Sequence, residues 1–217
     1  MSIQITDERV ENYMRGLLAA HDEPVLLEME RLAEKRNFPI VNRHVGVTLE
    51  ILTRSIGARK IFELGSGYGY SAYWFAKGGG EKAKVNCTDG DPKNAKTAEE
   101  FLKRAGLWDR ISFHVSDAVT ALRKTSGQYD IVYNDIDKHG YPEAWRESRD
   151  RVRPGGFYIC DNVLWSGRVA EKSPRDDPRP TWTKAIKEHN EMIASDKNYL
   201  SSILPIRDGV MLAYRLR

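Results

Sequence analysis

Apolar residues recur along the chain in two rhythms, helical in the first quarter and strand-like afterwards. Residues 10–18 place their apolar side chains on one helical face, after the candidate N-cap Thr6. Pro24–Lys35 is expected to form a second helix. A third apolar stripe, Val45–Ile56, ends at Gly57 as a helix C-terminus commonly does. The chain is therefore expected to begin with helices that precede any sheet.

From Lys60 onward, short β-prone runs alternate with helical stretches. Such alternation predicts parallel strands joined by right-handed helical crossovers. The last two runs are joined by the turn-rich residues 205–209, which indicates an antiparallel hairpin. The sequence predicts an α/β fold with five βα units and a terminal hairpin. The expected strands are Lys60–Leu64, Lys84–Thr88, Ile111–Val115, Tyr129–Asn134, Gly156–Cys160, Tyr199–Leu204 and Val210–Leu216.

Length and composition favour one soluble domain. The 217 residues suffice for a single α/β core, in which we expect residues 1–58 to form an N-terminal helical segment and residues 59–217 the core. No apolar run approaches the roughly 18 residues of a membrane span. The first residues lack a secretory signal, so a cytoplasmic location is expected. Cys87 and Cys160 are typical of buried strand cysteines rather than a disulfide. The net charge of +3 allows an anionic partner such as a CoA ester or RNA.

A glycine-rich segment, Glu63–Ser71, follows the first predicted strand and opens a helix. Glycines at this point of a parallel sheet let the backbone approach a ligand, although a tight turn without a ligand is the plainer alternative. In the dinucleotide fingerprint G-x-G-x-x-G the third glycine comes later than Gly69 does here, which disfavours NAD without excluding it. Asp89 ends the second strand, where a carboxylate can accept hydrogen bonds from the ribose of a nucleoside. Residues 116–118 follow the third strand, where they could hold an adenine or simply cap a helix.

Acidic residues gather at the ends of the fourth and fifth predicted strands. Asp135 follows the fourth strand, and Asp161 and Asn162 follow the fifth. Because the carboxyl ends of parallel strands share one edge, these oxygens are expected to converge, and they suit Mg²⁺ or a similar hard cation. Caps of turns and helices are the structural alternative.

Four segments together resemble one enzyme family: Phe62–Ala72, Tyr129–Lys138, Arg153–Val169 and Leu204–Gly209. They are similar to the cation-dependent O-methyltransferases, which include catechol and caffeoyl-CoA O-methyltransferases. The resemblance covers nearly the whole chain. It implies a Rossmann-like class I methyltransferase fold, a seven-stranded mostly parallel sheet with a C-terminal antiparallel hairpin. It also implies S-adenosylmethionine as the cofactor and Mg²⁺, Mn²⁺ or Ca²⁺ as the metal.

The resemblance also implies individual roles. Lys138 would be the general base. The residues implied at the S-adenosylmethionine site are Val41, Glu63, Gly65, Ser71, Asp89, Ala118 and Asp135, and those implied at the metal are Asp135, Asp161 and Asn162. In the implied mechanism two neighbouring hydroxyls of the acceptor bind the metal, and Lys138 removes the proton of the one to be methylated. A surface salt bridge to Asp137 is the alternative for Lys138. Tyr141, Trp165 and Arg168 are expected to flank the pocket.

Two acceptors are compatible with this chemistry. The first is a small hydroxylated aromatic molecule of the catechol or phenylpropanoid type. The second is 5-hydroxyuridine in transfer RNA, which some bacterial relatives methylate. A nucleotide-binding module or an NAD enzyme explains the acidic cluster less well. A homodimer is also expected, because the relatives are often dimers. For RNA, the phosphate-contacting surface would comprise Arg43, Arg54, Arg59, Lys60, Arg168, Lys172, Arg175 and Arg179.

Overall fold

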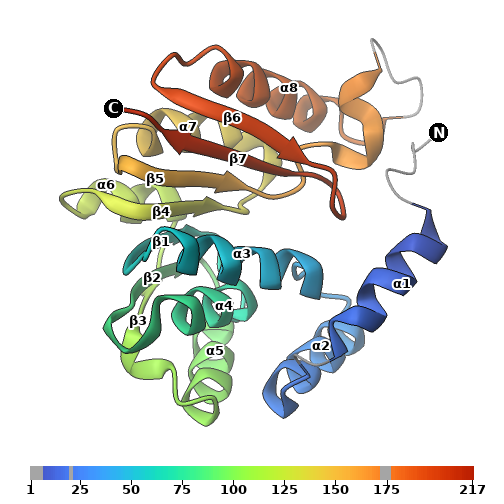
Figure 1. Cartoon of the computed structure of the whole chain (residues 1–217), viewed down its shortest axis with the longest axis vertical. Helices are drawn as coiled ribbons and strands as arrows, with labels where there is room; N and C mark the ends of the chain where they lie inside the picture. Colours follow the sequence, from blue (N-terminus) through green and yellow to red (C-terminus); the bar gives the residue numbers. More distant parts are fainter. Residues whose placement is uncertain (1–6, 20–21, 172–176) are drawn as a thin grey trace.

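A computed structural model describes residues 7–19, 22–171 and 177–217 (Figure 1). Seven strands in these ranges form one sheet in the order β3-β2-β1-β4-β5-β7-β6. Strands β1 to β5 are parallel, whereas β7 is antiparallel to both β5 and β6. The predicted sheet and hairpin are confirmed. The strands are β1 (Lys60–Leu64), β2 (Lys84–Asp89), β3 (Ile111–Val115), β4 (Tyr129–Asn134), β5 (Val152–Cys160), β6 (Tyr199–Leu204) and β7 (Val210–Arg215).

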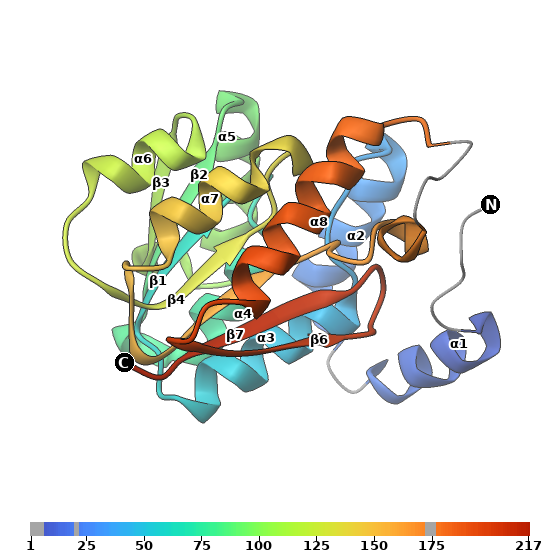
Figure 2. The same cartoon turned by 90° about the horizontal axis from the view of Figure 1, so that it is seen from above.

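Helices cover both faces of the sheet. Figure 2 shows α6, α7 and α8 on one face of the sheet, where their apolar residues form one buried cluster. The apolar residues of α2, α3, α4 and α5 form another buried cluster against the opposite face. The helices are α1 (Glu8–Leu17), α2 (Pro24–Arg36), α3 (Arg43–Ser55), α4 (Tyr70–Gly79), α5 (Pro92–Arg104), α6 (Ala118–Lys124), α7 (Tyr141–Ser148) and α8 (Pro180–Ala194), with the 3-10 turns η4 (Lys138–Gly140) and η5 (Trp165–Ala170) beside the sheet edge. No helix in the described ranges is long and apolar enough to span a bilayer.

Two differences from the predicted boundaries have a structural reason, while β2 ends one residue later and β7 one residue earlier than predicted. The expected N-cap Thr6 lies outside the described residues, and Asp7 caps α1 by accepting a hydrogen bond from the Arg9 backbone at 2.8 Å. Strand β5 begins at Val152 rather than at Gly156, because Val152 already pairs with β4 before the register shifts. Such a bulge allows glycine inside a strand, so β5 includes Gly155, which lies before the predicted start of the strand.

The N-terminal helix α1 has the predicted amphipathic pattern but little to pack against. None of its residues is buried, and Val10, Tyr13 and Leu17 are exposed. Figure 1 and Figure 2 show α1 at the margin of the molecule, away from the sheet. The 3.6-residue pattern therefore predicted the helix correctly, whereas the described part of the chain offers its apolar face no large contact surface.

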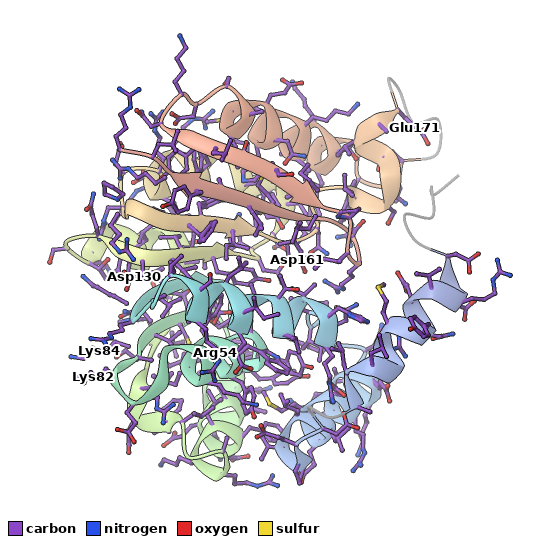
Figure 3. The ribbon with its side chains drawn as sticks, viewed as in Figure 1. Arg54, Lys82, Lys84, Asp130, Asp161 and Glu171 are labelled. Atoms are coloured by element: carbon purple, nitrogen blue, oxygen red, sulfur yellow. The ribbon has the colours of Figure 1, made fainter. Side chains whose placement is uncertain are left out.

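The two ends of the parallel strands have different roles. Figure 3 shows Asp130 near the amino ends of the strands and Asp161 near their carboxyl ends. Asp130, near the start of β4, accepts hydrogen bonds from the backbone of Arg59 at 2.8 Å and of Lys60 at 2.7 Å, and thereby ties β1 to β4. The carboxyl ends of the parallel strands meet at the edge marked by Asp161, where α/β folds bind ligands.

Candidate active site

A cavity of about 800 Å³ opens at the carboxyl ends of the parallel strands. Its walls come from the β1–α4 turn, the segments that follow β2 to β5, the start of α8 and the β6–β7 turn. Of the residues predicted to bind the cofactor or the metal or to act as the general base, all except Glu63 and Asp161 line the cavity. Those that do are Val41, Gly65, Ser71, Asp89, Ala118, Asp135, Lys138 and Asn162.

The glycine-rich turn forms the floor of the cavity and requires glycine for two reasons. Gly65, Gly67 and Gly69 have φ angles of 83°, 50° and 87°, in the left-handed region that side chains rarely adopt. A Cβ atom on Gly65 would also lie 2.7 Å from the carbonyl oxygen of Asp135. The turn is held against β2, where the Gly65 backbone donates to Thr88 Oγ1 at 3.1 Å. The turn is therefore tight enough to require glycine, and the predicted approach to a ligand stays a prediction.

Three aspartates lie at or just after the carboxyl ends of β2 and β3, and they differ in what they contact. Asp89 lines the cavity, and its Oδ1 atom accepts hydrogen bonds from the Asp91 backbone at 2.8 Å and from Asn94 Nδ2 at 3.0 Å. Asp91 caps α5. Asp117 caps α6 by accepting from the Thr120 backbone at 2.8 Å, so the helix-cap alternative holds for it, although it also lines the cavity.

Glu63 is a fully buried carboxyl group behind the glycine turn. Neither carboxylate oxygen has a hydrogen-bond partner of good geometry among the described residues. Burial raises the pKa of Glu63 from 4.5 to about 7, although Ser66 and Ser71 lie close enough to oppose the change. Glu63 therefore titrates near neutral pH, which an exposed glutamate does not do.

Lys138 enters the cavity from the turn after β4. Its Nζ atom donates to Asp135 Oδ1 at 2.9 Å and to the Ile136 carbonyl at 3.3 Å. The side chain is buried, and Asp137 is exposed and is not its partner, so the expected alternative of a surface salt bridge to Asp137 is wrong. Tyr141 does not flank the cavity as expected. It is buried behind Lys138, and its hydroxyl donates to the Asp161 carbonyl at 2.8 Å.

Asp161 is fully buried at the end of β5 and forms an ion pair with Arg207. The Arg207 Nη1 atom lies 2.5 Å from Asp161 Oδ2, and Nη2 donates to the Ile40 carbonyl at 2.9 Å. Burial and the nearby Asp135 raise the pKa of Asp161 to about 6, although Arg207 opposes the change. Sequence reasoning missed Arg207 as a site residue, although it stands in the segment Leu204–Gly209 that carried part of the resemblance.

The predicted metal ligands were tested against this geometry. Among the described residues no group of three or more His, Cys, Asp or Glu side chains is arranged to hold a metal ion, and the predicted set, with two aspartates and an asparagine, is not a group of that kind. Asp135 and Asp161 already bind Lys138 and Arg207, and Mg²⁺ needs oxygen atoms at about 2.0–2.1 Å in octahedral geometry. As arranged, a divalent cation would have to share Asp135 with Lys138 and Asp161 with Arg207, and Asp161 Oδ1 is the buried oxygen of this pair that has no hydrogen-bond partner among the described residues. The metal dependence stays a prediction.

The sequence matches the O-methyltransferase family over residues 18–216. The chain belongs to this family. It is 27% identical over 216 residues to a catechol O-methyltransferase of Niastella koreensis, covering 95% of this chain and 96% of the relative. It is 32% identical over 181 residues to a flavonoid 3',5'-methyltransferase of Vitis vinifera, covering 79% and 76%. The solved structure of an O-methyltransferase from Bacillus cereus, in complex with SAH, superposes with a TM-score of 0.85 at 26% identity and coverage of 95% and 97%. The resemblance and the expected class I methyltransferase fold are confirmed.

Aromatic rings form one wall of the cavity of this O-methyltransferase. Trp165 lines it as expected, and its ring centroid lies 5.8 Å from that of Trp182, which lies 6.0 Å from His139. Arg168 is not in the wall, where it was expected, and stacks on Trp165 at 5.7 Å instead. The guanidinium of Arg179 lies 4.2 Å from the Trp182 ring centroid. Trp182 and His139 were missed because α8 and η4 approach this wall from different parts of the chain.

The members of the expected RNA-contacting set that the structure describes are spread over different parts of this O-methyltransferase. Arg43 is buried and bound to Asp22 and Glu30, and Arg54 is paired with a neighbour on its own helix. Arg59 and Lys60 lie at the start of β1, on the edge opposite the cavity. Lys172 and Arg175 lie outside the described residues, so Arg168 and Arg179 are the members of the set that the structure places near the cavity.

Proposed function

We propose that this O-methyltransferase transfers a methyl group from S-adenosylmethionine to a hydroxyl of a small catechol-like or phenylpropanoid molecule. One observation carries the proposal. A single cavity joins the glycine turn and Asp89 at one end to Lys138 and the aromatic wall at the other. A nucleoside cofactor and a planar acceptor can therefore occupy it together.

The cofactor end suits S-adenosylmethionine in shape and charge. In the proposal, Asp89 accepts hydrogen bonds from the ribose through Oδ2, because its Oδ1 atom is engaged by the protein. In the proposal the amino-acid part of the cofactor lies against Gly65, and the adenine lies beside Ala118, since both residues line the cavity. Val41, Glu63, Ser71 and Asp135 complete the proposed set. The relative solved in complex with SAH supports this assignment.

The acceptor end suits an aromatic hydroxyl. Trp165 and Trp182 offer flat apolar surfaces, and aromatic rings pack favourably at such distances. S-adenosylmethionine supplies the methyl group as a sulfonium, so that the new C–O bond forms as the C–S bond breaks and its electron pair stays on sulfur. Lys138, the predicted general base, takes the hydroxyl proton on its Nζ atom. Rigid placement of both reactants supplies much of the rate, because each is held at a fixed distance from the other.

The other acceptor and the oligomeric state stay predictions. The separation of the basic residues gives 5-hydroxyuridine in transfer RNA no supporting observation in the described part of the chain. The predicted homodimer is measurable by light scattering coupled to gel filtration. Neither prediction alters the proposed methyl transfer.

The experiment has two arms. Calorimetry first measures S-adenosylmethionine binding, and mass spectrometry then measures methylation of catechol, caffeic acid, caffeoyl-CoA and transfer RNA that carries 5-hydroxyuridine. The proposal expects binding and methylation of at least one of the three small aromatic acceptors. Methylation of transfer RNA alone would refute the acceptor class, and absence of S-adenosylmethionine binding would refute the cofactor assignment.

A further inference from the structure

Arg207 occupies an unusual place in the fold. It stands in the β6–β7 turn with a φ angle of 52°, in the left-handed region that residues with a side chain rarely adopt. Its guanidinium is nevertheless held by two hydrogen bonds, to Asp161 and to the Ile40 carbonyl. Strained residues persist where surrounding contacts fix them, and they cluster at functional sites.

The charges around Arg207 balance. The two carboxylates of Asp135 and Asp161 face the two cations Lys138 and Arg207, at 2.9 Å and 2.5 Å. A buried carboxylate needs a compensating cation, and here each already has one from the chain itself. Arg207 occupies Oδ2 of Asp161, while Oδ1 is buried and has no hydrogen-bond partner among the described residues, so a divalent ion at Asp161 would lie on the same carboxylate as the Arg207 guanidinium and compete with its charge.

Arg207 also faces the space where the acceptor would react. It lines the cavity together with Lys138 and Asn162, and its side chain is 28% exposed, whereas Asp161 behind it is 0% exposed. A guanidinium carries five N–H donors, of which the two recorded bonds use two. Donors therefore remain for an oxygen in the cavity.

We propose that Arg207 is the resident cation of this site: it takes the place of a divalent metal ion, neutralises Asp161 and donates a hydrogen bond to the acceptor oxygen. This inference rests on the proposed methyl transfer for its catalytic part. As Lys138 takes the hydroxyl proton, the acceptor oxygen becomes negative, and a fixed donor stabilises that charge until the C–O bond forms. Turnover then needs no added divalent cation.

The test compares Arg207→Gly with the unchanged enzyme. Glycine adopts a φ of 52° without strain, so the backbone of the turn is preserved while Asp161 loses its cation. Mn²⁺ binding is measured by electron paramagnetic resonance in the presence of SAH, and turnover is measured with EDTA and with Mg²⁺. Arg179→Gly is the matched control, because it removes a cavity cation that pairs with neither carboxylate.

The proposal expects the unchanged enzyme and Arg179→Gly to show no Mn²⁺ binding up to millimolar concentration. Arg207→Gly should bind Mn²⁺, and adding Asp161→Asn should abolish that binding. Turnover of the unchanged enzyme should survive EDTA, and that of Arg207→Gly should fall at least about 100-fold in EDTA and recover in part with Mg²⁺. Loss of wild-type turnover in EDTA, or equal Mn²⁺ binding with and without Arg207, would overturn it. Methylation of no acceptor would count against the proposed function, while the Mn²⁺ comparison would still decide the role of Arg207.

Discussion

Replacing Glu63 by glutamine should stabilise the protein, and increasingly so as the pH rises. The folded-state pKa of Glu63 is about 7 and its ordinary value is 4.5, so the folded protein holds the proton more tightly than the unfolded chain does. The contribution of Glu63 to stability is thus fullest below pH 4.5 and is lost as the pH rises through 7. Glutamine carries no charge at any of these pH values and keeps the size of the protonated acid.

The magnitude follows from the two pKa values. Each unit of difference between the folded and unfolded pKa values corresponds to about 1.4 kcal/mol. Relative to a side chain that does not ionise, Glu63 therefore lowers the free energy of unfolding by about 3 kcal/mol above pH 8 and by about 1 kcal/mol at pH 5. The group is fully buried, so solvent does not screen this cost. The stability advantage of Glu63→Gln should therefore grow by about 2 kcal/mol between pH 5 and pH 8.

Urea unfolding at the two pH values measures this growth. The fluorescence of the buried Trp74 and Trp145 reports the transition, in the absence of any ligand. Glu100→Gln, on the exposed side of α5, is the control and should show a constant difference from the wild type. An advantage of Glu63→Gln that stays the same at pH 5 and pH 8 would refute the assignment of a near-neutral pKa.

Three further predictions concern the site. Lys138→Met should lower kcat by roughly 10²–10⁴-fold, as loss of a general base does, while calorimetry finds S-adenosylmethionine affinity nearly unchanged; unchanged kcat would remove Lys138 from that role. Asp89→Ala should weaken S-adenosylmethionine binding by roughly 10- to 100-fold through the lost ribose hydrogen bonds, with the unfolding midpoint as the control for folding. Gly65→Ala should destabilise the protein by more than about 1 kcal/mol in urea unfolding, because the added Cβ would meet the Asp135 carbonyl at 2.7 Å in a left-handed backbone; equal stability would contradict the close approach.

The features predicted well from the sequence are those set by local pattern. The strands were located by short β-prone runs, and the hairpin by the turn between β6 and β7. Gly65 was singled out because a turn at this point needs backbone without a side chain, and the structure shows the contact that requires it. Asp135 and Asp161 were placed at one edge because parallel strands align their carboxyl ends.

The features that the sequence did not predict depend on contacts between distant segments. Arg207 meets Asp161 across 46 positions of the chain, and Trp182 reaches the aromatic wall from α8. Residue type gave no indication of either partner, since an arginine in a turn is usually solvated. The partner of Lys138 was equally ambiguous, because Asp135 and Asp137 stand on either side of Ile136, and only the path of the backbone after β4 decides between them.

The distribution of charge along the cavity gives a reason why one end suits the cofactor and the other the acceptor. The cofactor end carries the carboxylates of Asp89 and Asp117, which favour the positive sulfonium of S-adenosylmethionine. At the acceptor end Lys138, Arg179 and Arg207 line the cavity, while the carboxylate that compensates Arg207 is buried behind the wall. Donors that line the cavity stabilise an oxygen that becomes negative, and the Asp135 carboxylate, which also lines the cavity, is paired with Lys138. The same acidic strand end that suggested a metal site from the sequence thus presents, once Arg207 is in place, hydrogen-bond donors to the acceptor.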